Sequence, residues 1–169
     1  PIFLLFPRLV ARSWHAAPAL REEASEEPDS QRVFKLAGIL GILAYHQSRG
    51  EERTRVLVPD SAHGTNPATG TMSGLDVTNL PTDHEGGIDL AELDSRMDSD
   101  VAAIMLTLPS TLGLFERRIL DVVQRVHAAG AQVYCDGANM NAMLGRVRPG
   151  DLGIDVMHLN LHKTFSTPH

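Results

Sequence analysis

Apolar runs of strand length recur along the chain and are separated by segments with helical spacing. Five segments are predicted to form strands: 55–58, 75–80, 101–107, 132–135 and 156–161. Residues 101–107 (VAAIMLT) are apolar almost throughout, which is typical of a strand buried on both faces of a parallel sheet. None of these runs approaches the roughly 20 apolar residues that cross a bilayer, so we expect no membrane span.

Between the predicted strands, apolar residues recur at the helical period. The clearest helix covers 118–129, where Ile119, Val122, Val123 and Val126 share one face. Shorter or more apolar helices are predicted at 36–46, 68–74 and 89–97. Strands that alternate with helices predict an α/β fold, a three-layer arrangement around a mostly parallel sheet. In such sheets, ligands bind outside the carboxyl ends of the strands.

Composition narrows the class of protein. The 169 residues are 43% hydrophobic and 21% charged, as expected for one globular domain with a sizeable core. A net charge of −6 argues against nucleic acid as a main partner. The single cysteine, Cys135, allows no internal disulfide and lies in an apolar run, where we interpret it as a small buried hydrophobe. The histidines and acids lack the spacing of metal ligands, so we expect no metal site.

Two predicted strands end next to residues that suit pyridoxal phosphate chemistry. Asp136 follows Val133–Cys135, and Lys163 comes shortly after the run at 156–161. A lysine can form a Schiff base with the cofactor's aldehyde, and a carboxylate can keep the pyridine nitrogen protonated so that the ring accepts electrons. His63 and Thr111 also follow predicted strands, so the topology would gather all four residues at one edge of the sheet.

Each of these residues also has a plain structural interpretation. Lys163 could be a solvated charge, and Asp136 could be the acid of an Asp-Gly turn. His63 could cap a helix, and Thr65 and Thr111 could be caps as well. The remaining histidines are interpreted as structural: His46, His84 and His127 at the surface or at helix ends, and His158 as a core histidine with satisfied hydrogen bonds.

Several longer sequence motifs resemble those of a known protein family. DSAHGTNPATG, LPSTLGLFE, VYCDGANMNAMLGRVRPGDLGIDVMHLNLHKTF and the final TPH resemble the glycine dehydrogenases (decarboxylating), the P-proteins of the glycine cleavage system. The wording is most similar to the second subunit of the two-subunit bacterial form. The resemblance runs from about residue 37 to residue 169 and is dense from residue 56 onward.

The resemblance implies the large domain of an aspartate-aminotransferase-like enzyme that depends on pyridoxal 5′-phosphate. It implies that Lys163 carries the cofactor as an internal aldimine and that Asp136 pairs with the pyridinium nitrogen. By the same resemblance, His63 lies over one face of the ring and Ala138 beneath the other. Further positions that match the motifs line the site without an assigned role: Thr65, Thr111, Asn139 and His162.

The resemblance also implies a reaction and partners. Glycine is decarboxylated, carbon dioxide leaves, and the aminomethyl group passes to the lipoyl arm of the H-protein. The chain would associate with a first subunit in a hetero-oligomer, in the bacterial cytoplasm or, in a eukaryote, in mitochondria. Because the acceptor has to reach the cofactor, we expect the site to open towards a partner surface.

Departures from the family pattern leave alternatives open. Residues 32–36 (RVFKL) stand where the family has a Gly-rich GAQGE-type stretch that helps to hold the cofactor phosphate, and Leu108 and Ser110 replace two asparagines. We therefore expect an unassigned segment at 1–34 and a partial cofactor-binding domain at 35–169 that lacks the C-terminal small domain. The chain begins without Met and is interpreted as a fragment or a processed product. Alternatives are an inactive fragment with an assembly role, or another lysine-aldimine enzyme such as an amino acid decarboxylase or cysteine desulfurase.

Overall fold

The computed structural model describes residues 30–166 and, within the first helix, side chains from residue 33 onward. Five parallel strands form one sheet in the order β2-β1-β3-β4-β5. Their bounds are β1 Arg55–Pro59, β2 Asp76–Leu80, β3 Val101–Thr107, β4 Gln132–Asp136 and β5 Val156–His158. The predicted parallel α/β fold is confirmed.

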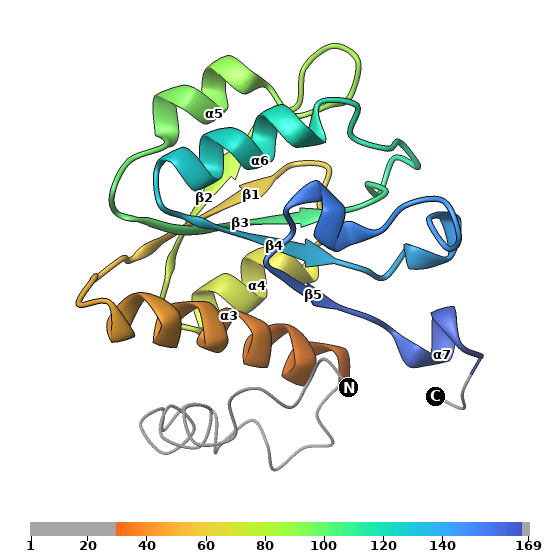
Figure 1. Ribbon diagram of the computed structural model, residues 1–169, viewed down its shortest axis with the longest axis horizontal. Helices are drawn as coiled ribbons and strands as arrows, with labels where there is room; N and C mark the ends of the chain where they lie inside the picture. The colour runs from red at the N-terminus through yellow and green to blue at the C-terminus, as the bar shows by residue number, and fades with distance from the viewer. Residues whose placement is uncertain (1–29, 167–169) are drawn as a thin grey trace.

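Helices cover both faces of this sheet and complete the three layers (Figure 1). One face is covered by α3 (Ser30–Ser48) and α4 (Thr65–Met72), and the other by α5 (Leu90–Arg96) and α6 (Ile119–Ala128). After β4 the chain makes two short 3-10 helices, η2 (Met140–Ala142) and η3 (Pro149–Leu152), and after β5 the single-turn α7 (Leu161–Thr164).

Each face of the sheet has its own hydrophobic core. On the α5–α6 side, Val122 and Val126 pack with strand residues such as Ile104, and all three are 0% exposed. On the α3–α4 side, Ile39 and Ile42 of α3 pack with β1, β3 and β4. Every residue of β3 is buried, as expected for a central strand covered on both faces.

The last strand is shorter than predicted, and this changes the setting of Lys163. We expected a strand over 156–161, but β5 ends at His158 and α7 begins at Leu161. The side-chain Oδ1 of Asn160 lies 3.1 Å from His158 Nε2, and the backbone carbonyl of Asn160 accepts the backbone N–H of Lys163 (3.0 Å). These bonds turn the chain into a helix, so Lys163 lies on α7 and does not directly follow the strand.

Of the two settings predicted for His46, the surface or a helix end, the structure shows the helix end. His46 lies near the end of α3, but it is 1% exposed. Its Nδ1 lies 2.8 Å from Glu51 Oε2 and its Nε2 lies 3.0 Å from the Ala102 carbonyl on β3. Hydrogen bonds from Arg49 and then His46 lower the pKa of Glu51 to about 2. His46 therefore attaches the end of α3 to the central strand.

Candidate active site

The carboxyl ends of the strands place polar residues along one edge of the sheet. Asp136 ends β4, Thr107 ends β3, and His63 lies in the loop after β1. The strand order reverses between β1 and β3, and ligands of open α/β sheets bind at such a reversal. Thr107 Oγ1 joins the two strand ends by accepting the backbone N–H of His63 (2.8 Å).

Asp136 is the buried acid of this edge and is 0% exposed. Its Oδ1 accepts the backbone N–H of Ala138 (3.0 Å) and lies 3.3 Å from His158 Nε2. Its Oδ2 lies 2.6 Å from the Nζ atom of Lys35. Oδ2 has no aligned hydrogen bond, so the interaction with Lys35 is an ion pair without hydrogen-bond geometry. A buried carboxylate needs such a compensating cation.

Lys35 of α3 extends this network to the loop after β1. The ammonium group, which is also 0% exposed, donates a short hydrogen bond to Thr65 Oγ1. Thr65 Oγ1 lies 2.8 Å from His63 Nδ1, which also accepts the backbone N–H of Thr65 (3.3 Å). Because Nδ1 accepts, the His63 ring carries its proton on Nε2 when neutral. Asp136, Lys35, Thr65 and His63 thus form one continuous chain of polar contacts.

Sequence reasoning missed the role of Lys35. Lys35, Ile39 and Ile42 follow one another at helical spacing and share the buried face of α3. A charged residue in line with apolar residues on a buried face requires a partner, because an unpaired buried charge is costly. That pattern was the available signal, and it indicates an acid somewhere in the core.

His158 holds Asp136 from the other side. The Tyr134 hydroxyl lies 3.0 Å from His158 Nδ1, and the acceptors Asn160 Oδ1 and Asp136 Oδ1 both face Nε2. This arrangement places the ring proton on Nε2 and makes Tyr134 the donor to Nδ1. Burial lowers the pKa of His158, and Lys35 lowers it further, while Asp136 opposes both. The interpretation of His158 as a satisfied core histidine is confirmed, although it also contacts Asp136.

The other predicted site residues lie in the loops and in the helical turn that follow β3, β4 and β5. Ala138 is buried beside Asp136. Thr111 Oγ1 donates to the Ser61 carbonyl and Asn139 Nδ2 donates to the Pro109 carbonyl, both at 3.0 Å, so these two residues connect loops of the same edge. His162 is half-buried on α7, and Lys163 beside it is exposed. Asp136, the acid of the predicted lysine–acid pair, therefore contacts Lys35. Lys163, the predicted lysine of that pair, lies in the solvent-facing turn after β5.

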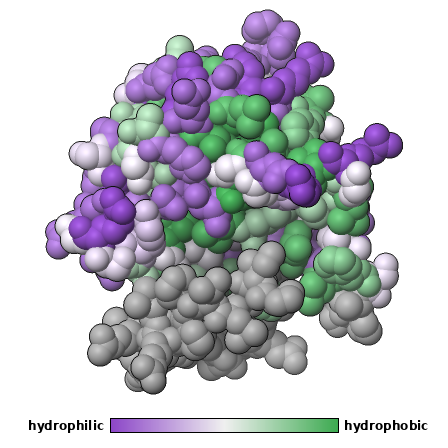
Figure 2. Space-filling model, in the orientation of Figure 1, coloured by the Kyte–Doolittle hydropathy of each residue, from purple (hydrophilic) through white to green (hydrophobic). Residues whose placement is uncertain are grey.

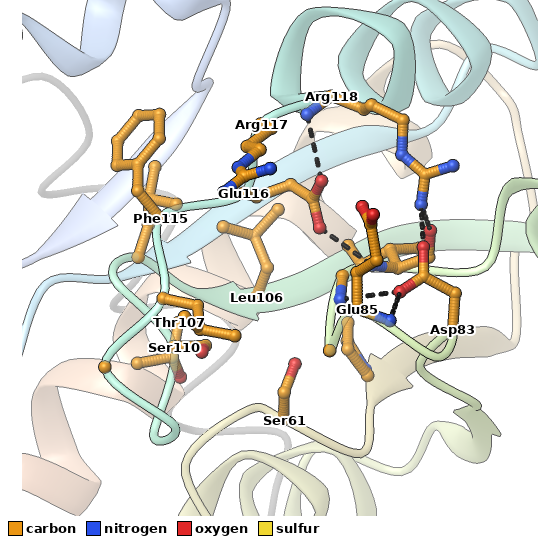
Figure 3. A pocket seen from close by; sticks show the side chains of 17 residues that line it. Ser61, Asp83, Glu85, Leu106, Thr107, Ser110, Phe115, Glu116, Arg117 and Arg118 are labelled. Atoms are coloured by element: carbon orange, nitrogen blue, oxygen red, sulfur yellow. Dashed lines mark hydrogen bonds and ion pairs between the residues drawn. The ribbon is translucent and has the colours of Figure 1, made fainter.

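A cavity of about 580 Å³ lies at the ends of β1 and β3, and its lining does not include Asp136, Lys35 or His63. Figure 3 shows the hydroxyl groups of Ser61, Thr107 and Ser110 along one side of it. On the other side, Arg118 pairs with Asp83, and Glu116 Oε2 accepts the backbone N–H of Ile88 (2.7 Å). These contacts attach the loop after β2 to the loop before α6 and give the cavity a fixed wall.

Exposed apolar side chains accompany the site. Large hydrophobic residues remain exposed in the loops and helix ends near this edge: Phe34, Leu112, Leu114, Phe115, Leu144, Leu161 and Phe165. Figure 2 shows apolar residues on the surface at the right of the view, where α7 lies in Figure 1. Apolar surface of this kind is typical of a region that contacts another molecule.

Neither a metal cluster nor a membrane helix is present in the described part of the chain. Among residues 30–166, no group of three or more His, Cys, Asp or Glu side chains could hold a metal ion. Over the same range, no helix has both the length and the apolar character needed to cross a membrane.

The fold is that of an α/β protein with a buried acid at the carboxyl edge of its parallel sheet, the edge at which such proteins bind ligands. Residues 41–168 match the model of the class-V aminotransferase family, and the chain belongs to that family.

Curated relatives share much of this sequence. A probable glycine dehydrogenase (decarboxylating) subunit 2 of Thermosipho africanus is 60% identical over 84% of this chain. Its counterpart in Treponema denticola is 52% identical over 86% of the chain. The chain spans about 30% of the length of each relative. Among solved structures, sphingosine-1-phosphate lyase of Burkholderia pseudomallei is similar in fold, with a TM-score of 0.69 and 18% identity over 95% of this chain and 41% of the lyase.

Proposed function

We propose that this chain forms part of the cofactor-binding domain of a glycine dehydrogenase (decarboxylating). The observation that carries the proposal is Asp136, a fully buried carboxylate held at the end of β4 with a cation beside it. The name of the curated relatives supports the assignment and does not favour the alternative of a chain with only an assembly role. The reaction would be the decarboxylation of glycine, with transfer of the aminomethyl group to a lipoyl arm.

The cofactor implied by this function is pyridoxal 5′-phosphate, and the side chains around Asp136 suit it. Asp136 Oδ2 has no aligned hydrogen bond and so retains acceptor capacity for a ring nitrogen. His63 and Ala138 would lie against the two faces of the ring, and Lys163 would hold the aldehyde end. When bound, the cofactor supplies an acceptor for the electron pair that decarboxylation leaves on the substrate carbon.

Residues of the chain would orient and protect this site. His158 and the Ala138 N–H hold Asp136 Oδ1, which leaves Oδ2 directed to a cation. The hydrogen bonds of His63 Nδ1 with Thr65 fix the orientation of the imidazole ring. Burial of Asp136 excludes water from the carboxylate, which strengthens its interaction with a positive charge. Thr111, Asn139 and His162 are proposed to line the same site.

The proposed partners follow from the same assignment. They are glycine, a lipoylated H-protein and a first subunit, in a cytoplasmic hetero-oligomer. The relatives are named as subunit 2, which supports a first subunit. The exposed apolar residues near the carboxyl edge support a protein partner there, since such surface favours association.

A covalent labelling experiment tests the proposal, because the sequence contains only two lysines, Lys35 and Lys163. Pyridoxal 5′-phosphate would be titrated into the purified chain, the absorbance recorded, and the product reduced with borohydride and mapped by mass spectrometry. We expect an absorbance band near the edge of the visible range and a covalent label on Lys163. Lys163→Ala should lose both the absorbance band and the label. Lys35→Met and Lys35→Gln, which keep Lys163, are the matched controls.

A chain that takes the label would then be assayed for glycine-dependent exchange of bicarbonate into glycine. An unchanged absorbance in Lys163→Ala, or a label found on Lys35 instead, would contradict the proposed role of Lys163.

A further inference from the structure

We propose that Lys35 occupies the place at Asp136 that the cofactor's ring nitrogen takes, so that the cofactor binds only after Lys35 leaves the carboxylate. This inference rests on the proposed function. It assigns to Lys35 the role of an internal competitor that sets the affinity for pyridoxal 5′-phosphate.

The contacts of Asp136 leave one position for a cation. Oδ1 is already approached by the Ala138 N–H at 3.0 Å and by His158 Nε2 at 3.3 Å. Oδ2 lies 2.6 Å from Lys35 Nζ, and both side chains are 0% exposed. A ring nitrogen that binds Oδ2 has to enter the space that the ammonium group fills.

Charge leads to the same conclusion. Asp136 carries one negative charge, and Lys35 balances it inside the protein. A protonated ring nitrogen on the same carboxylate would add a second cation, and two like charges close together in a buried site repel each other strongly. The two cations are therefore alternatives at Asp136.

Lys35 has a route away from the acid. Its ammonium group also donates to Thr65 Oγ1, so it keeps a hydrogen-bond partner other than Asp136. The four-carbon stem of lysine is flexible, so the side chain can leave Oδ2 by changing rotamers while α3 stays in place. Its neighbour Phe34 is 42% exposed, so this part of α3 is close to solvent.

The first test compares cofactor affinities. Pyridoxine 5′-phosphate has the ring and the phosphate but no aldehyde, so it reports binding at Asp136 without reaction at a lysine. We expect Lys35→Met to bind it, and pyridoxal 5′-phosphate, at least about tenfold more tightly than the original chain. Lys35→Gln, which keeps a donor for Thr65 without the charge, should behave similarly. Arg53→Met is the matched control, because Arg53 is a largely buried cation, with 8% of its side chain exposed, that pairs with Glu51 away from this edge.

The second test uses the unaltered chain and does not depend on a variant that folds. Acetylation with an N-hydroxysuccinimide ester should modify the exposed Lys163 quickly and the buried Lys35 slowly. Saturating pyridoxine 5′-phosphate should raise the rate at Lys35 several-fold over the rate measured at Lys35 without the ligand. Mass spectrometry of the two peptides gives both rates.

The outcomes separate this inference from the proposed function. The inference is overturned if both Lys35 variants bind the ring compounds no more tightly than the original chain, or if the acetylation rate at Lys35 does not change. A label on Lys163 in the same experiments would still support the proposed function. If neither ring compound binds the original chain or the variants, both fail. Tighter binding by the variants with faster acetylation of Lys35 supports the inference.

Discussion

Gly137 offers a direct test of how closely the site residues are packed. It follows Asp136 and crosses beside β5, where its backbone N–H donates to the His158 carbonyl at 3.0 Å. A Cβ atom added at this position would lie 2.4 Å from that carbonyl oxygen and 2.5 Å from Met157 Cε. The oxygen belongs to the backbone and cannot swing away, so Gly137→Ala has to push β5 from β4.

The magnitude follows from two costs. Inserting a methyl group into a packed region costs about 1–3 kcal/mol, and losing the net contribution of the Gly137–His158 hydrogen bond adds about 0.5–1.5 kcal/mol. We therefore expect Gly137→Ala to lower the free energy of unfolding by about 1.5–4.5 kcal/mol. In a chain of this size that lowers Tm by roughly 3–18 °C. The displacement would also lengthen the contact between His158 and Asp136.

The assay is urea unfolding of the full chain, followed by circular dichroism and repeated by thermal melting. Gly41→Ala is the matched control, because Gly41 lies inside α3 and an added Cβ meets nothing within 4 Å. That variant should gain about 0.5–1 kcal/mol, since alanine loses less backbone freedom in a helix than glycine. If Gly137→Ala unfolds at the same urea concentration as the original chain, the close approach of β4 and β5 at this point is refuted.

Two further predictions concern buried titratable groups. Because the pKa of His158 is lowered below its ordinary value of 6.5, the unfolded chain binds more protons than the folded one in that range. Stability should fall as the pH drops below 6.5, and His158→Gln should flatten this part of a pH series of urea midpoints. Burial raises the pKa of Cys135 to about 12, with Asp136 adding to the effect. Iodoacetamide should therefore leave Cys135 unmodified in the folded chain and alkylate it in urea; rapid alkylation without urea would contradict its burial.

The sheet and most helices were predictable because they depend on local patterns. The run at 101–107 is apolar at nearly every position, and the structure places it in the centre of the sheet as β3. The apolar stripe of 118–129 similarly matches α6. Such patterns report which side chains are buried and do not require knowledge of distant neighbours.

The end of the last strand depended on a contact that the pattern does not contain. The run VMHLNL is apolar enough to extend a strand to residue 161, but the Asn160 side chain bonds to His158, and the backbone carbonyl of Asn160 accepts the N–H of Lys163. Local bonds made by asparagine compete with a sheet ladder in this way. The position of Lys163 on α7 followed from that competition.

The partner of Asp136 could not be predicted from strand ends alone. The sequence pattern correctly placed the acid at the carboxyl edge, and His63 joins its network through Thr65 and Lys35. The cation, however, comes from α3, a helix far earlier in the chain that packs across β4 and β5. Which lysine reaches a buried acid is decided by how layers pack, and spacing along the sequence does not encode it.

The place of Lys35 within α3 has a dynamic consequence. It lies near the start of the helix, whereas Ile39 and Ile42 farther along hold α3 against the sheet. Lys35 can therefore leave Asp136 by changing rotamers while Ile39 and Ile42 keep α3 on the sheet, so the acid becomes available without any opening of the core.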